Sequence, residues 1–141
     1  KARHEVYYSV KSQSNNTKVY TTDVCVPISK LVNCINFAEN EIKKYGLKAP
    51  MVGHVGDGNF HTQIMYNQNN KNDYKIIRDF SNKLINKALE LEGTVTGEHG
   101  IGIQKKEYLV KQHYDCIPLM KSLKKTIDPN NIMNPGKLID L

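Results

Sequence analysis

Residues 49–67 read APMVGHVGDGNFHTQIMYN, and they decide the predicted fold. Two alternating apolar segments flank a central Asp-Gly pair, which favours a two-residue hairpin turn. Such a turn pairs Val55 with Phe60 and His54 with His61 across the two strands. Directly opposed residues have Cβ atoms about 5 Å apart and share a sheet face. We therefore expect the two histidines together on one face, with Val55 and Phe60 on the other face, in the core.

Strand and helix patterns precede the hairpin. Val6, Tyr8 and Val10 alternate like a strand, and VYTTDVCVP (19–27) predicts another strand. The stretch SKLVNCINFAENEIKKYG (29–46) has apolar residues at spacings of three and four, which predicts an amphipathic helix. We expect its first residue, a serine, to cap this helix and its last, a glycine, to end it.

Helical patterns dominate the remainder of the chain. DYKIIRDFSNKLINKALELEG (73–93) carries one apolar stripe, a Gly-rich connection follows over residues 93–104, and residues 105–114 and 117–129 also favour helix. This order of elements predicts an α+β fold of the ferredoxin-like kind, an antiparallel sheet with helices packed on one face. We expect only part of such a sheet, because the chain starts in mid-pattern without an initiator Met.

Composition narrows the class of protein. The chain has 141 residues, of which 39% are hydrophobic and 24% charged, as expected for a single globular domain. No apolar run approaches the roughly 20 residues that a bilayer span requires. The net charge of +6 comes from scattered lysine pairs on predicted helices, so we expect no nucleic-acid partner, whereas a small anionic substrate would suit this charge. The three cysteines lack zinc-finger spacing, which favours reduced packing thiols.

The paired histidines suggest a metal site. Two imidazoles at the expected separation can share one cation at about 2.1 Å each. The alternative is a metal-free histidine pair on a polar face. A third ligand is available in TGEHGIG (96–102), where glycines flank Glu98 and His99. His54, His61 and Glu98 would form a His₂-carboxylate site with positions open to substrate. Alternatively, the loop only turns a corner and Glu98 caps the next helix.

The neighbouring His99 is expected to point away from Glu98 in an extended segment. An imidazole ordinarily titrates near neutral pH, which suits proton transfer. His99 is therefore a candidate acid or base.

Four stretches, TTDVCVPIS, GHVGDGNFH, GTVTGEHGIG and MNPGK, occur in this order along the chain. In sequence and separation they resemble the C-terminal domain of FAD-linked 2-hydroxyacid dehydrogenases. Within that family it resembles the cytochrome-linked D-lactate dehydrogenases, which belong to the flavoenzyme superfamily that includes vanillyl-alcohol oxidase. The resemblance covers essentially residues 1–141 and implies one C-terminal domain for substrate and metal, with the FAD-binding domain outside this chain.

The resemblance also implies roles for individual residues. His54, His61 and Glu98 match the family's divalent metal ligands, for which zinc is favoured and manganese or iron are alternatives. His99 matches the catalytic base. Arg3 matches an arginine that binds the substrate carboxylate.

At the other end of the chain, Asn134 and Lys137 match residues beside the FAD. The implied reaction is oxidation of a D-2-hydroxy acid, D-lactate foremost, to the 2-oxo acid, with hydride transfer to FAD and then to an acceptor such as cytochrome c or a quinone. Mitochondria are the implied compartment, with cytoplasm as the alternative. From the residues alone, a stand-alone metallohydrolase or a non-catalytic metal-binding module remain open.

Overall fold

A computed structural model describes Tyr8, Ser12 and residues 17–141. The chain divides into two compact units, the first ending at Gly97 and the second running from Glu98 to Leu141. The first unit contains β1 (Thr17–Thr21), β2 (Val24–Cys25), α2 (Ile28–Tyr45), β3 (Met51–His54), the 3₁₀ turn η1 (Val55–Asp57), β4 (Asn59–Asn67) and α3 (Lys71–Glu90). The second contains α4 (Lys106–His113), the 3₁₀ turn η2 (Tyr114–Cys116) and α5 (Ile117–Ile127).

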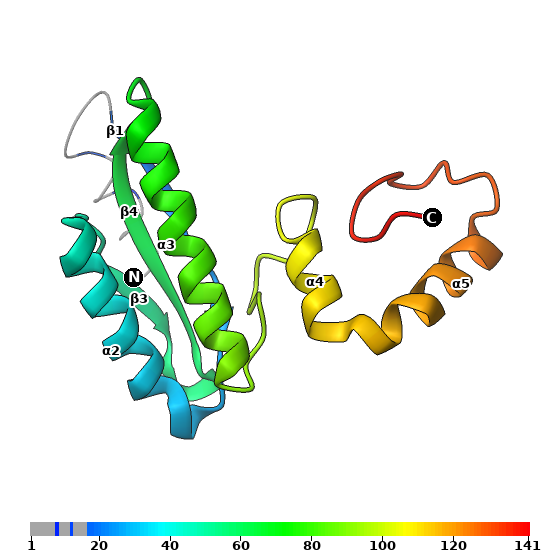
Figure 1. Cartoon of the computed structure of the whole chain (residues 1–141), viewed down its shortest axis with the longest axis horizontal. Helices are drawn as coiled ribbons and strands as arrows, with labels where there is room; N and C mark the ends of the chain where they lie inside the picture. The colour runs from blue at the N-terminus through cyan, green and yellow to red at the C-terminus, as the bar shows by residue number, and fades with distance from the viewer. Residues whose placement is uncertain (1–7, 9–11, 13–16) are drawn as a thin grey trace. The chain divides into compact units, whose positions relative to one another are not determined.

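Strand β4 is the central strand of a four-stranded antiparallel sheet (Figure 1). It pairs with β3 along one edge and with β1 and β2 along the other. Thr17 lies opposite Asn67 and Cys25 lies opposite Asn59, so β1 and β2 keep the same register along β4. The two are therefore parts of one strand that is interrupted at residues 22–23.

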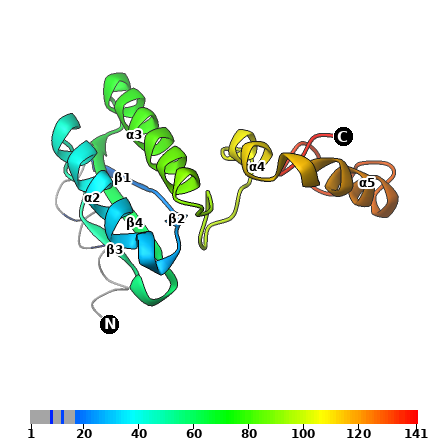
Figure 2. The same cartoon turned by 60° about the horizontal axis from the view of Figure 1, so that its bottom comes forward.

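Helices α2 and α3 lie side by side on one face of this sheet (Figures 1 and 2). Because side chains alternate along a strand, every second residue of β4 faces these helices. Phe60 and Ile64 are such residues, with exposed fractions of 3% and 0%. Full burial of an apolar side chain of this size contributes about 1.5–3 kcal/mol. The other core side chains of this unit include Val24, Val26, Leu31, Cys34, Ala38, Ile77, Phe80, Leu84 and Ala88.

The ends of α2 follow from local chemistry at Pro27 and Gly46. Gly46 adopts a φ of 63°, and its N–H donates to the carbonyl of Lys43 at 3.1 Å, so the predicted glycine stop is confirmed. The prediction that Ser29 caps the helix is wrong, because Pro27 occupies the N-cap position and no side chain caps it. The backbone carbonyl of Pro27 accepts a hydrogen bond from the N–H of Lys30 at 2.8 Å, so the first turn finds an acceptor in the backbone itself.

Helix α3 begins earlier than its apolar stripe alone predicts. Asn70 is its N-cap, and the Asn70 side-chain oxygen accepts a hydrogen bond from the backbone N–H of Asn72 at 3.0 Å. The apolar spacing of the sequence starts the stripe at Ile76, but Ile76 is only partly covered, and the fully buried residue is Ile77. The predicted amphipathic helix is confirmed, and it begins two residues and ends three residues before the predicted bounds.

The second unit is held at the end of α5 by Asp128. Its buried carboxylate accepts hydrogen bonds from the backbone N–H groups of Ile132 at 3.0 Å and Met133 at 2.9 Å, and it forms an ion pair with Lys124. The hydrogen bond from Lys124 lowers the pKa of Asp128.

No helix among the described residues is long and apolar enough to cross a membrane.

The order of elements in the first unit is strand, helix, two strands, helix, and the third strand lies between the first and the second. This is the arrangement of the ferredoxin-like split βαβ motif, and the predicted α+β class is confirmed. The strand predicted from Val6, Tyr8 and Val10 is wrong at Tyr8, the one of these residues that the structure describes. Tyr8 is helical, and its carbonyl accepts a hydrogen bond from the N–H of Ser12 at 2.9 Å. Val6 and Val10 lie outside the described residues.

Candidate active site

A polar face lies on the side of the sheet opposite the two helices. We define it by Asp23, Asn59, His61 and Gln63, whose exposed fractions are 2%, 3%, 8% and 6%. The last three alternate with Phe60 and Ile64 along β4, so they project away from the helix-covered core. Buried polar side chains usually have hydrogen-bond partners or serve a function. This concentration of them marks the polar face as the candidate site.

The hairpin beside this face has a different register from the predicted one. His54 lies opposite Asn59, and Val52, not His54, lies opposite His61. The predicted two-residue turn is therefore wrong, and residues 55–58 form a longer connection that begins with η1. The predicted partner of Phe60, Val55, is 64% exposed and not in the core.

Gly58 explains the longer turn. Its φ is 74°, its carbonyl accepts a hydrogen bond from the N–H of Val26 at 3.0 Å, and an added Cβ would lie 1.9 Å from the carbonyl oxygen of Val26. Contact with the neighbouring strand thus determines the turn. Because the register is shifted by two residues, His54 and His61 still share a sheet face, as diagonal neighbours, typically about 7–8 Å apart.

The tautomer of His61 follows from its neighbours. Its Nδ1 lies 3.1 Å from the backbone carbonyl oxygen of Thr22 and 3.5 Å from Oδ1 of Asp23. A carbonyl oxygen can only accept, so Nδ1 carries the hydrogen and donates it. In the neutral ring the lone pair is then on Nε2. A histidine held in this tautomer is ready to bind a cation through Nε2.

The same aspartate anchors the glycine-rich connection. Oδ2 of Asp23 accepts hydrogen bonds from the hydroxyl of Thr96 at 2.6 Å and from the N–H of Gly97 at 2.9 Å. Gly97 has no room for a side chain, because a Cβ there would lie 1.9 Å from Nδ2 of Asn59. Asp23 therefore fixes the position of Gly97, which directly precedes Glu98 in the chain.

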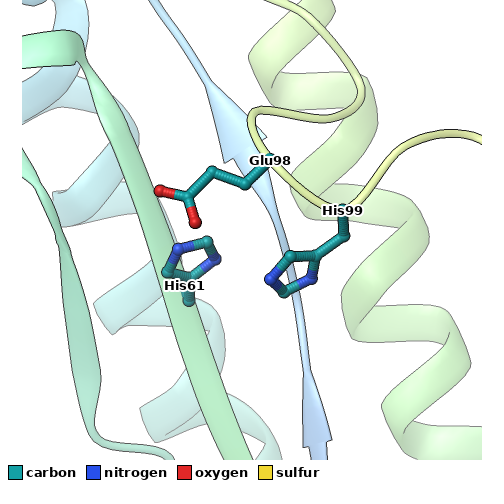
Figure 3. Close-up of side chains that lie close together, drawn as sticks. All are labelled: His61, Glu98 and His99. Carbon is teal, nitrogen blue, oxygen red and sulfur yellow. The ribbon is translucent and has the colours of Figure 1, made fainter. Parts of the chain in front are cut away.

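Three side chains that can bind a metal lie close together (Figure 3). His61, Glu98 and His99 offer ligand atoms that lie within 4.8 Å of one another. Imidazole nitrogen and carboxylate oxygen are donors that suit zinc, manganese and iron. Two of the three predicted ligands, His61 and Glu98, are thus in this group, and His54 is not a member of it. The predicted base, His99, is a member.

Two buried oxygen atoms on the polar face have no hydrogen-bond partner among the described residues: Oδ1 of Asn59 and Oε1 of Gln63. The amide nitrogen of Asn59 donates to Oδ1 of Asp23 and to the carbonyl of Val24, both at 2.9 Å, which fixes the direction of its oxygen. Unpaired buried acceptors cost free energy unless a donor reaches them. A bound water or a substrate hydroxyl is the kind of donor that would satisfy them.

The other predicted site residues have separate outcomes. Arg3 lies outside the described residues. Asn134 and Lys137 are exposed and close one turn, in which the N–H of Lys137 donates to the carbonyl of Asn134 at 3.3 Å. The φ of Asn134 is 48°. The predicted contact of this turn with FAD remains a prediction.

Sequence reasoning missed Asp23, Asn59 and Gln63. A signal was present, because aspartate is rarely buried without partners and is depleted in strands. The single acidic residue inside VYTTDVCVP was therefore a candidate for a polar role. Its charge also acts on Cys25, whose pKa is raised by burial and further by Asp23 and Asp57.

The chain belongs to the FAD linked oxidase family: the model of its C-terminal domain matches residues 1–138. The family prediction made from the four sequence motifs is confirmed.

Individual relatives carry more specific names. The chain is 41% identical to a Danio rerio protein named "Probable D-lactate dehydrogenase, mitochondrial", with 100% of the chain and 29% of that protein covered. It is 39% identical to an Arabidopsis thaliana protein named "D-lactate dehydrogenase [cytochrome], mitochondrial", with 99% and 25% covered. It is 38% identical to the "Glycolate oxidase subunit GlcD" of Bacillus subtilis, with 82% and 25% covered. The chain thus spans between a quarter and a third of the length of these relatives.

Proposed function

We propose that this chain is the substrate- and metal-binding part of a flavin-dependent dehydrogenase that oxidises a D-2-hydroxy acid, D-lactate foremost, to the 2-oxo acid. Family membership and the names of the relatives support the reaction class. The observation that carries the proposal for the site is the group of His61, Glu98 and His99 at the edge of a buried polar face. The proposal treats residues 1–141 as one functional domain whose FAD-binding partner lies outside this chain.

A divalent cation fits the donor set of this site. We assign His54, His61 and Glu98 as its ligands, with zinc favoured over manganese or iron. Support comes from the shared sheet face of the two histidines and from the tautomer of His61, which leaves Nε2 available. When bound, the cation supplies Lewis acidity toward the substrate hydroxyl.

The remaining residues bind substrate and move its proton. His99 accepts the proton of the 2-hydroxyl group, and Arg3 binds the substrate carboxylate through its two-pronged guanidinium group. Asn134 and Lys137 would hold the FAD, which when bound would supply the acceptor for the hydride from C2. An electron acceptor such as cytochrome c or a quinone then completes the cycle. We assign the protein to mitochondria, with cytoplasm as the alternative, because two of these relatives carry "mitochondrial" in their names.

The decisive experiment measures flavin reduction by D-lactate in the full-length protein, before and after the change His99→Ala. General-base catalysis typically contributes about 10²- to 10⁴-fold in rate, so the variant should reduce its flavin more slowly by that factor. Bound FAD and metal should remain, because His99 is assigned as base and not as ligand. Reduction within a few-fold of the parent would remove His99 from this role.

Elemental analysis of the same variant separates base from ligand. Loss of metal from His99→Ala, with full retention in His54→Ala, would transfer the third ligand position from His54 to His99. Hydrolytic turnover without bound flavin would instead favour a metallohydrolase. Bound metal without any turnover would favour a non-catalytic metal-binding module.

A further inference from the structure

Asp23 is the most buried charged side chain on the polar face, with 1% of its side chain exposed. It occupies the interruption between β1 and β2. The register on either side of this interruption places it directly opposite His61 on β4. Aspartate is seldom found so deeply buried unless it is paired.

Each carboxylate oxygen of Asp23 faces donors. Oδ1 accepts from Nδ2 of Asn59 at 2.9 Å and lies 3.5 Å from Nδ1 of His61. Oδ2 accepts from the hydroxyl of Thr96 and from the N–H of Gly97. Oδ1 thus binds side chains of β4, and Oδ2 binds the segment that leads to the Gly-Glu-His-Gly sequence.

We propose that Asp23 is a positioning residue, which holds His61 in its Nδ1–H tautomer and fixes the backbone at Gly97, so that both approach a bound divalent cation in a set geometry. The inference rests on the proposed metal site. It adds a residue that binds no metal and touches no substrate, but joins two segments that are far apart in the sequence.

A carboxylate is required for this role. An ionised carboxylate only accepts hydrogen bonds, and it does so at both oxygens. Asparagine has one accepting oxygen and one donating nitrogen. In Asp23→Asn, the amide nitrogen must therefore face either the donors on β4 or those of Thr96 and Gly97, and one side of the junction is lost.

The tautomer of His61 depends on the same junction. The Thr22 carbonyl accepts the Nδ1 hydrogen, and the adjacent carboxylate favours that hydrogen electrostatically. Removing partners of this kind typically lowers metal affinity about 10- to 100-fold. The inferred effect is therefore large enough to measure without any turnover assay.

The test uses the full-length protein with bound metal removed, and zinc alone as the probe. Competition with a chromogenic chelator should show zinc binding about 10- to 100-fold weaker in Asp23→Asn than in the parent. Hydrogen exchange should show faster exchange in residues 94–97 of Asp23→Ala, because this variant removes the acceptor of the Gly97 N–H altogether.

A matched control is available in Thr62→Val. Thr62 is fully buried and shares a hydroxyl–hydroxyl hydrogen bond of 2.7 Å with Thr22, but its side chain is on the helix-covered face of β4. This variant loses a buried hydrogen bond next to His61 in sequence, without touching Asp23. Its zinc affinity and the exchange of residues 94–97 should equal those of the parent.

The outcomes separate this inference from the proposed function. If His61→Ala binds zinc as tightly as the parent, the proposed metal site is wrong, and unchanged exchange of residues 94–97 in Asp23→Ala would then overturn the positioning role as well. If His61→Ala loses zinc but Asp23→Asn keeps parental affinity, only the positioning role is overturned. Should Asp23→Asn fail to fold, Thr96→Val removes a single donor to Oδ2, and unchanged zinc affinity and exchange in that variant would refute the inference.

Discussion

Gly97→Ala tests whether the glycine-rich connection is packed against the sheet as tightly as the structure indicates. A Cβ at residue 97 would lie 1.9 Å from Nδ2 and 2.7 Å from Cγ of Asn59, and 3.1 Å from Oδ1 of Asp23. These separations are too short for non-bonded atoms, which attract best at about 3.5–4.0 Å. Either the amide of Asn59 or the backbone at residue 97 must move.

Each movement breaks two hydrogen bonds. If Asn59 moves, its Nδ2 loses Asp23 and the carbonyl of Val24, both at 2.9 Å. If the connection moves, Asp23 loses the hydroxyl of Thr96 and the N–H of Gly97. Leaving a buried polar group without its partner costs about 1–3 kcal/mol, so two lost bonds should lower the free energy of unfolding by about 2–6 kcal/mol.

Equilibrium unfolding in urea, followed by circular dichroism, measures this loss. The matched control is Gly56→Ala, since a Cβ at Gly56 meets no atom within 4 Å. Replacing such a glycine by alanine is expected to be neutral or to stabilise by up to about 1 kcal/mol. A Gly97→Ala protein within about 0.5 kcal/mol of the parent, the range usual for surface substitutions, would refute the packing described for Gly97.

Three further predictions concern metal, thiols and acid. His61→Ala should lose the stoichiometric zinc of the full-length protein in elemental analysis, and retention would contradict its assignment as a ligand. At pH about 8, alkylation mapped by mass spectrometry should modify the exposed Cys116 first and Cys34 last, because burial raises the pKa of Cys34 to about 11 and leaves roughly one thiol in a thousand ionised; early modification of Cys34 would contradict its burial. Lys124 lowers the pKa of Asp128, so this carboxylate stabilises the fold above its ordinary pKa of about 4, and the stabilisation is lost as the pH falls through the lowered value. The thermal unfolding temperature of Asp128→Asn should therefore depend less on acid pH than that of the parent. Equal dependence in the two proteins would refute this role of Asp128.

Apolar periodicity was sufficient to predict the helices and the class of fold. The stripes of residues 29–46 and 73–93 correspond to α2 and α3 with differences of one to three residues at the ends. Periodicity is reliable here because both helices bury one face against the sheet. The helix ends depend on caps. The sequence favoured Ser29 as the N-cap of α2, but Pro27, two residues earlier, occupies that position.

The buried polar face could be predicted only in part. His61 and Glu98 stand out in sequence because glycines and a turn surround them. Asp23 is surrounded by ordinary strand residues, and its importance arises from Thr96 and Gly97, more than 70 positions further along the chain. Such a contact follows from the register of β1, β2 and β4, which no local pattern specifies.

The hairpin shows which part of a local prediction is robust. Turn preference alone gave the wrong register. The N–H of Val26, directly after β2, donates a hydrogen bond to the carbonyl of Gly58, and this contact outweighs the preference of an Asp-Gly pair for a two-residue turn. Residues on a strand alternate between faces with a period of two, so a register shift of two residues preserves the face on which every side chain lies. His54 and His61 therefore remain on the same face although they are not directly opposed. A shift of one residue would have placed them on opposite faces and removed His54 from any shared site, so the sequence constrains which face the histidines occupy more strongly than it constrains the distance between them.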